Sequence, residues 1–358
     1  MPVTTAARAK GEDPLLSALP AQTIAPADTG GAEPSKLDAV RALVAADMGE
    51  VNAIVLDRMR SEVELIPQLA RHLIAAGGKR VRPILTLLSS RLCGYRGRRH
   101  LGLAAAVEFI HTATLLHDDV VDASDLRRGT PTANAVWGNK APVLVGDFLF
   151  SRAFELMVED GSLKVLKILS HASAVIAEGE VAQLTAQRQI ATNEDTYLHI
   201  IEAKTAALFS AACKIAPVVA EAGDEAEQAL VAFGRNLGIA FQLVDDAIDY
   251  TSEEATSGKS LGDDFREGKM TLPIILAYAR GSAEDRAFWQ SAVSGDRTSD
   301  DDLAHAISLL RDADAIGDTL ERARLYARRA LDAIAGFPNG KARAALTEAV
   351  EFAVARAY

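Results

Sequence analysis

Two aspartate-rich segments of the sequence have the composition and spacing of a metal site. Their carboxylates are Asp118, Asp119 and Asp122 in the first segment and Asp245, Asp246 and Asp249 in the second. Each segment ends a very apolar stretch, so in a helix its first and last aspartates lie about one turn apart on one face. Carboxylates crowded there repel one another and interact unfavourably with the helix dipole. Each segment could be a solvated acidic helix end, but the repetition favours a hard cation such as Mg²⁺.

Basic residues near glycine turns and near the two acidic segments could bind phosphate groups. Arg forks and Lys point charges are the usual protein partners of phosphates. Any one of these side chains could be an ordinary surface charge, but together with two metal-type segments they indicate two diphosphate sites. The basic candidates are Lys79, Arg82, Arg127, Arg128, Lys204, Lys259 and Lys269.

Length and composition restrict the class of protein and of partner. The chain has 358 residues, of which 49% are hydrophobic, and this is enough for a large core. Its net charge of −11 argues against nucleic acid as a partner. Cys93 and Cys213 form neither a metal-ligand spacing nor a disulfide framework, which favours a reducing compartment such as the cytoplasm. No apolar run has the length and flanks of a membrane span, so we expect a soluble protein without a membrane anchor.

Helical periodicity dominates the sequence from Lys36 onward. Residues 1–35 show no periodicity and are rich in Ala, Pro, Thr and Gly, so we predict a mobile tail before one all-α domain over 36–358. Neither convincing strands nor a repeat of fixed period is evident. The predicted helices span residues 37–60, 61–75, 83–93, 101–122, 142–158, 163–190, 194–221, 224–251 and most of 271–358, with a polar loop over 252–269.

Polar residues mark the starts of several of these helices. Either Thr192 or Asn193 could cap the helix that begins at Glu194, and Ser282 and Ser299 could cap helices in the last part of the chain. Within the helices that carry the acidic segments, His111 and Gln242 lie on the same faces as the aspartates. Both side chains should therefore point toward the predicted metal site.

Six motifs together resemble the trans-isoprenyl diphosphate synthases of the polyprenyl synthetase family. The resemblance covers roughly residues 40–358 and implies a single large helical domain of the isoprenoid synthase type with a central active-site cavity. Its members join isopentenyl diphosphate to an allylic diphosphate such as farnesyl diphosphate, using Mg²⁺. The motifs are GGKRVRP, HTATLLHDDVVD, DLRRGTPTAN, EAKTAALF, GIAFQLVDDAID and GKSLGDDFREGKMTLP.

The resemblance also implies a role for each candidate residue. The diphosphate of isopentenyl diphosphate would be bound by Lys79, Arg82, His111 and Arg128. The allylic diphosphate would be gripped by Arg127, Lys204, Lys259 and Lys269, with Thr205 and Gln242 near the reacting carbon. Magnesium would be held by Asp118, Asp119, Asp122 and Asp245, with Asp246 and Asp249 in support. Charge balance suggests about three Mg²⁺ ions when substrate is bound.

Product length in this family depends on the residues four and five positions before the first acidic motif. Here they are Thr114 and Ala113, and a small pair resembles enzymes with medium and long products. The surrounding motif is most similar to octaprenyl and decaprenyl diphosphate synthases, which supply the side chains of quinones such as ubiquinone. Alternatively, Ala113 could serve only close helix packing, and the product could be of the shorter geranylgeranyl type.

Three other functions fit the motifs less well. A terpene cyclase normally mixes Asn, Ser or Thr, and Glu in its second motif and lacks the isopentenyl site that GGKRVRP implies. A metal-dependent phosphohydrolase, suggested by the pair His117–Asp118, would need further paired histidines. A non-catalytic subunit of a two-component synthase often loses one acidic motif, whereas both are intact here. The family further implies a homodimer, and release of a long product implies transient contact with a membrane.

Overall fold

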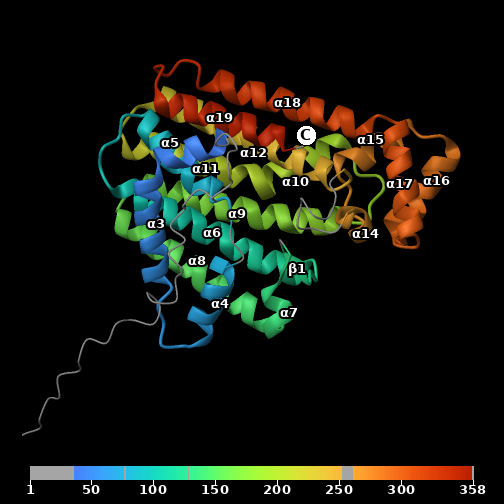
Figure 1. Ribbon diagram of the computed structural model, residues 1–358, viewed down its shortest axis with the longest axis horizontal. Coiled ribbons are helices and arrows are strands. Elements are labelled where there is room, and N and C mark those ends of the chain that lie inside the picture. The colour runs from blue at the N-terminus through green and yellow to red at the C-terminus, as the bar shows by residue number, and fades with distance from the viewer. Residues whose placement is uncertain (1–35, 76–77, 128, 252–260, 357–358) are drawn as a thin grey trace, which may run out of the picture.

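The computed structural model describes residues 36–75, 78–127, 129–251 and 261–356. The predicted tail and the predicted sites at Arg128 and Lys259 lie outside this part of the chain. Within it, the predicted all-α architecture is confirmed, and long helices run roughly along the longest axis of the molecule (Figure 1). Over the same residues, no helix is long and apolar enough to cross a bilayer.

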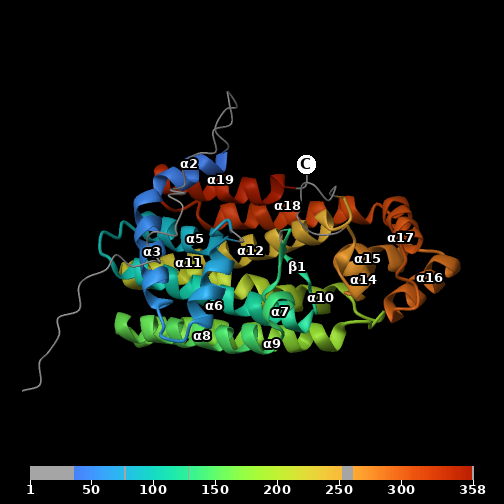
Figure 2. The same cartoon turned by 60° about the horizontal axis from the view of Figure 1, so that its bottom comes forward.

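In the first half of the chain, α8 and α9 lie side by side in the lowest layer of Figure 2, whereas α2 lies beside α19 at the top. Helix α6 packs on both α8 and α5. The elements are α2 (Lys36–Leu43), α3 (Ala45–Arg58), α4 (Leu65–Ala75), α5 (Val81–Leu92), α6 (Arg99–Val121), β1 (Leu126–Arg127), β2 (Thr130–Pro131), α7 (Ala133–Trp137), α8 (Lys140–Asp160) and α9 (Leu163–Ala186).

The second half adds a central pair of helices, α11 and α12, and covers it with α18 and α19 on the opposite side (Figure 2). Helices α14 to α17 gather at one end (Figure 1). The elements are α10 (Glu194–Ile201), the π-helical turn η1 (Glu202–Ala206), α11 (Ala207–Val219), α12 (Asp224–Ile248), α14 (Asp263–Glu267), α15 (Leu272–Arg280), α16 (Ala283–Ser294), α17 (Asp300–Asp312), α18 (Ala315–Ala333) and α19 (Lys341–Ala355).

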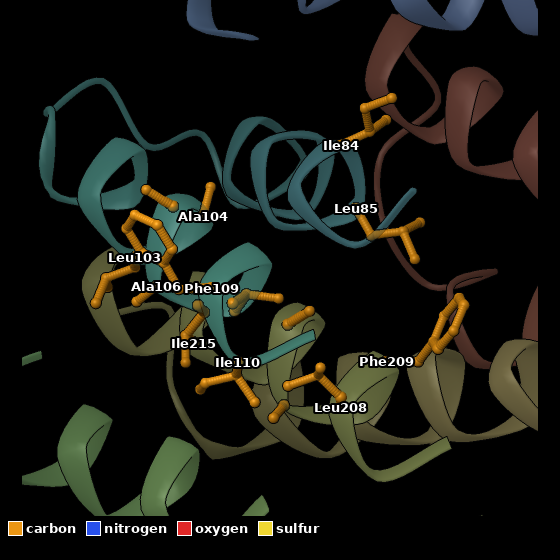
Figure 3. Close-up of a cluster of buried hydrophobic side chains, with 14 of the residues drawn as sticks. Ile84, Leu85, Leu103, Ala104, Ala106, Phe109, Ile110, Leu208, Phe209 and Ile215 are labelled. Atoms are coloured by element: carbon orange, nitrogen blue, oxygen red, sulfur yellow. The ribbon is translucent and has the colours of Figure 1, made fainter. Parts of the chain in front are cut away.

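The core that positions the first acidic segment is built by α5, α6 and α11 (Figure 3). Alanines such as Ala104 and Ala106 let these helices approach closely, while Phe109, Ile110 and Phe209 fill the space between them. Because α6 is buried on all sides from Leu103 to Ile110, its polar side chains reach a ligand from its C-terminal half, which begins at His111.

The predicted caps are confirmed. The Asn193 side chain accepts a hydrogen bond from the Thr196 backbone N–H at 2.9 Å. Ser282 and Ser299 each begin a helix and form a reciprocal capping box with the Asp three residues later. These interactions join residues within one helical turn, which is why the sequence alone predicted them.

Three local predictions were wrong. The single helix predicted over 194–221 is interrupted by the π-helical turn η1. No strand was expected, but β1 and β2 pair as a two-stranded antiparallel hairpin. These strands are too short to show an alternating pattern, and Gly129 between them has a φ of 73°. The polar loop after α12 contains the short helix α14.

Candidate active site

The first acidic segment lies at the C-terminal end of α6, and each of its carboxylates faces a different cation. Arg127 donates to Asp119 at 2.7–2.8 Å. The Lys204 ammonium lies 3.7 Å from an Asp118 oxygen, and the Lys269 ammonium lies 3.5 Å from an Asp122 oxygen. The fold therefore brings together three of the cations predicted to grip the allylic diphosphate.

The second acidic segment ends α12, and two of its carboxylates, Asp246 and Asp249, accept hydrogen bonds. Buried Asp246 accepts from the Tyr197 hydroxyl at 2.5 Å and from the Gln242 side-chain amide at 2.7 Å. Gln242 in turn accepts from the Thr205 hydroxyl at 2.8 Å. The Asp249 carboxylate accepts from the Asp264 backbone N–H at 3.2 Å. Burial raises the pKa of Asp246 to about 7, and the nearby carboxylate of Asp264 adds to the shift.

The two segments are linked through Lys269, which follows α14. Its ammonium contacts Asp122 of the first segment, Glu267, and Asp264 at 3.9 Å. The backbone N–H of Asp264 binds Asp249 of the second segment. Burial alone would lower the pKa of Lys269, but these three carboxylates raise it overall, so the side chain stays charged.

A second group of basic residues lies at the start of α5. Arg82 donates to the His111 ring Nε2 at 3.0 Å, which requires this nitrogen to be unprotonated, and the Arg82 guanidinium stacks 4.5 Å from the Phe209 ring centroid. Burial lowers the pKa of Arg82 to about 10. Its Nε is buried and has no hydrogen-bond partner among the described residues. The predicted meeting of Arg82 and His111 is therefore present, and it retains an unused donor for an anion.

Lys79 lies beside this group and is exposed. Its ammonium lies 5.1 Å from the ring centroid of Phe352 on α19. Arg80, between the two predicted anion-binding residues, instead forms an ion pair with Glu108. Neutralised in this way, Arg80 is committed to the fold, and Lys79 and Arg82 remain the candidates for binding phosphate.

The two acidic segments fit a hard cation by their chemistry, since their six aspartates offer carboxylate oxygens as metal ligands. In the described part of the chain, no three acidic, His or Cys side chains are close enough to hold an ion in the present arrangement. The negative charge of the first segment is instead balanced by Arg127, Lys204 and Lys269. Binding of Mg²⁺ would therefore require these cations to exchange partners.

The candidate chain-length residues lie on α6, one to two turns before the first acidic segment, and Ala113 is part of the core. Ala113 is fully buried, and Thr114 is half-buried with its hydroxyl donating to the His111 carbonyl at 2.8 Å. This position is compatible both with the wall of a product tunnel and with close helix packing, so the role of Ala113 stays a prediction.

Comparison with known proteins decides the family. The polyprenyl synthetase family model matches residues 63–310. The chain belongs to the polyprenyl synthetase family. It is 43% identical over 323 residues to the octaprenyl diphosphate synthase of Escherichia coli K12, covering 89% of this chain and 99% of that protein. The predicted enzyme class, a polyprenyl diphosphate synthase and hence a prenyltransferase, is confirmed.

Solved structures of family members have the same fold. A polyprenyl synthase from Caulobacter crescentus CB15, complexed with calcium and isoprenyl diphosphate, superposes with a TM-score of 0.88 at 50% identity, covering 91% of this chain and all of that one. A decaprenyl diphosphate synthase from Rhodobacter capsulatus gives a TM-score of 0.86 at 49% identity, covering 90% and 99%. The isoprenoid synthase fold that the sequence predicted is therefore confirmed.

Several residues of this family member's site were missed by sequence reasoning. Glu180 on α9 binds Lys204 at 2.7 Å, Tyr197 binds Asp246, and Arg356 at the end of α19 lies 3.1 Å from Asp245. Burial raises the pKa of Glu180 to about 7, and Asp118 adds to the shift. Glu180 stands next to a glycine inside an apolar stretch, a signal that could have been noticed, whereas nothing local distinguished Tyr197 or Arg356.

Proposed function

We propose that the protein condenses isopentenyl diphosphate with an allylic diphosphate, such as farnesyl diphosphate, and repeats this step to make a long all-trans polyprenyl diphosphate. The observation that carries the proposal is the set of three cations, Lys204, Arg127 and Lys269, which lie within 3.7 Å of the carboxylates of the first acidic segment. A substrate that brings its own negative phosphates and a divalent ion could take over both halves of these ion pairs.

The two groups of basic residues suit two different phosphates. The cations beside the first segment would bind the allylic diphosphate, and Lys79, Arg82 and His111 would bind isopentenyl diphosphate. Mg²⁺ bound by Asp118, Asp119, Asp122, Asp245 and Asp249 would help to neutralise the charge that develops on the allylic leaving group. Both oxygens of Asp246 already accept hydrogen bonds, so Asp246 would support this set by orienting Gln242.

The reaction follows from this arrangement of charges. The allylic C–O bond breaks, and its electron pair leaves with the diphosphate, whose charge Lys204, Arg127 and Lys269 stabilise. The double bond of isopentenyl diphosphate attacks the allylic carbon and forms the new C–C bond. The departing diphosphate takes the proton that is lost, which restores a double bond in the lengthened chain. The linked side chains of Thr205 and Gln242 would lie beside the reacting carbon.

For the product, we propose a length between octaprenyl and decaprenyl, as a precursor of quinone side chains. The small pair Ala113 and Thr114 and the similarity to an octaprenyl and a decaprenyl diphosphate synthase support this range. A homodimer in the cytoplasm fits the family, and exposed apolar side chains along the neighbouring helices α8 and α9 would suit a contact between two copies. These side chains are Leu144, Val158, Leu163, Val181 and Leu184.

Incubation with farnesyl diphosphate, labelled isopentenyl diphosphate and Mg²⁺, followed by dephosphorylation and chromatography, tests the proposal. We expect octaprenyl to decaprenyl alcohols and no product after chelation of the metal. Products that stop near geranylgeranyl would correct the length. A complete lack of turnover, with rescue by a second protein, would indicate a subunit of a two-component synthase.

A further inference from the structure

Lys204 has two acidic neighbours, and the closer one lies outside both aspartate-rich segments. Its ammonium lies 2.7 Å from Glu180 Oε2 and 3.7 Å from Asp118 Oδ2. The three side chains come from α9, from the turn η1 and from α6, and each is largely buried. Glu180 therefore competes directly with Asp118 for the charge of Lys204.

The backbone around this contact is built for close approach. A Cβ atom at Gly179 would lie 2.8 Å from the Lys204 backbone nitrogen and 2.8 Å from the Ala203 Cβ. On the other side of the turn, a Cβ at Gly238 of α12 would lie 2.6 Å from the Ala206 Cα. Two glycines thus seat η1 between α9 and α12, and π-helical turns of this kind often occur at functional sites. The backbones that carry Glu180 and Lys204 are consequently fixed relative to each other.

Glu180 contributes little to the fold at this place. Its Oε1 is buried and has no hydrogen-bond partner among the described residues. A buried carboxylate with a single partner carries a desolvation cost that one ion pair does not reliably offset. A poorly satisfied buried carboxylate that contacts one lysine of the site points to a role in the reaction.

We propose that Glu180 is a positioning residue that holds the Lys204 ammonium away from Asp118. With Lys204 drawn toward α9, the Asp118 carboxylate stays available to a cation, and the ammonium faces the position beside it where a diphosphate binds. Without Glu180, the Lys204 ammonium forms a direct ion pair with the Asp118 carboxylate, and the charge of each group is neutralised by the other. This inference rests on the proposed function, because it assigns a task within the same site.

The variant Glu180→Gln tests it, since it keeps the size of the side chain and removes the charge. We expect kcat to fall about 10- to 100-fold, the loss typical of removing an outer partner of a charged site. The KM for isopentenyl diphosphate should stay near that of the wild type. The melting temperature should be unchanged or higher, because a poorly satisfied buried charge is gone. Glu178→Gln, an exposed change two residues away on the same helix, is the matched control.

Binding gives a readout that does not depend on turnover. Titration calorimetry with inorganic pyrophosphate and Mg²⁺ should show weaker binding for Glu180→Gln than for Glu178→Gln. If the wild-type protein lacks synthase activity, the proposed function fails while this titration still tests Glu180. Wild-type turnover and wild-type pyrophosphate binding in Glu180→Gln would overturn the inference, and so would a lowered melting temperature with equal losses for both substrates.

A double-mutant cycle shows whether Glu180 acts through Lys204. In a Lys204→Met background, adding Glu180→Gln should cause no further loss of turnover or of pyrophosphate binding. A full additional loss would mean that Glu180 acts on its own and would overturn the assignment as a positioning residue. If Glu180→Gln fails to fold, Glu180→Asp, which shortens the reach to Lys204 but keeps the charge, should reproduce the loss of turnover.

Discussion

The two acidic segments end similar buried helices, but they are held by different chemistry. In the first segment each carboxylate faces a long, flexible cation: Lys204, Arg127 or Lys269. In the second, Asp246 and Asp249 accept hydrogen bonds from Tyr197, Gln242 and a backbone N–H, and Arg356 forms an ion pair with Asp245. The first segment can therefore exchange its partners when a diphosphate arrives, whereas the second is held in shape beforehand.

The largest expected effect comes from removing one carboxylate of either segment. Asp118→Ala and Asp245→Ala should each lower kcat at least about 100- to 1,000-fold, because both carboxylates act on charge that develops in the reaction. Neither variant should unfold the protein, since relief of like-charge crowding offsets the lost ion pairs. Activity assays and thermal melts are the measurements, with Asp312→Ala, an exposed change, as the control. Near-normal turnover in both variants would contradict the proposal that these aspartates bind Mg²⁺.

The next effect separates the two groups of cations. Arg82→Ala should chiefly raise the KM for isopentenyl diphosphate, and Lys204→Ala should chiefly impair the allylic substrate or its ionisation. Loss of one buried charged contact typically costs about 2–5 kcal/mol. Steady-state constants for each substrate, measured with the other saturating, distinguish the two outcomes. Identical effects of both variants on both substrates would contradict two separate diphosphate sites.

A third prediction changes the product and not the rate. If the allylic substrate sits at the first segment, its growing chain should pass down α6 beside Ala113, where alanine leaves room and a phenol ring does not. Ala113→Tyr should therefore fold, ionise its substrate normally and stop at about three or four isoprene units, at an overpacking cost of about 1–3 kcal/mol. Chromatography after dephosphorylation measures the length. A chain of wild-type length would show that Ala113 does not line the product path.

The last expected effect is on stability and not on turnover, and it concerns the second segment in the absence of metal. The pKa of Asp246 is about 7 in the folded protein, against an ordinary value of 3.8. The folded state therefore binds this proton more tightly than the unfolded state, so the free energy of unfolding should fall as pH rises from about 4 to about 7. Asp246→Asn, which cannot ionise, should remove this part of the pH dependence. Urea unfolding of both proteins at pH 5 and pH 8 measures it. If the free energy of unfolding changed equally between these pH values in the two proteins, the prediction would be contradicted.

Sequence alone determined the features whose cause is local. The helical register of Asp118 and Asp122, the caps at Asn193, Ser282 and Ser299, and the apolar helices that end at each acidic segment all depend on residues within a turn or two. The similarity of six motifs to one family then predicted the fold and the class of enzyme, and both are confirmed.

Only the tertiary structure determined which charged side chains form ion pairs with one another. Lys204 lies between Glu180 and Asp118, and Lys269 bridges the ends of α6 and α14, although these residues are far apart in the chain. Their meeting depends on how closely α9 and α12 pack against the turn η1, which the absence of side chains at Gly179 and Gly238 permits. Hydrophobic periodicity predicts that a helix is buried but not which helix it touches, so Glu180, Tyr197 and Arg356 became part of the site only once the helices were packed.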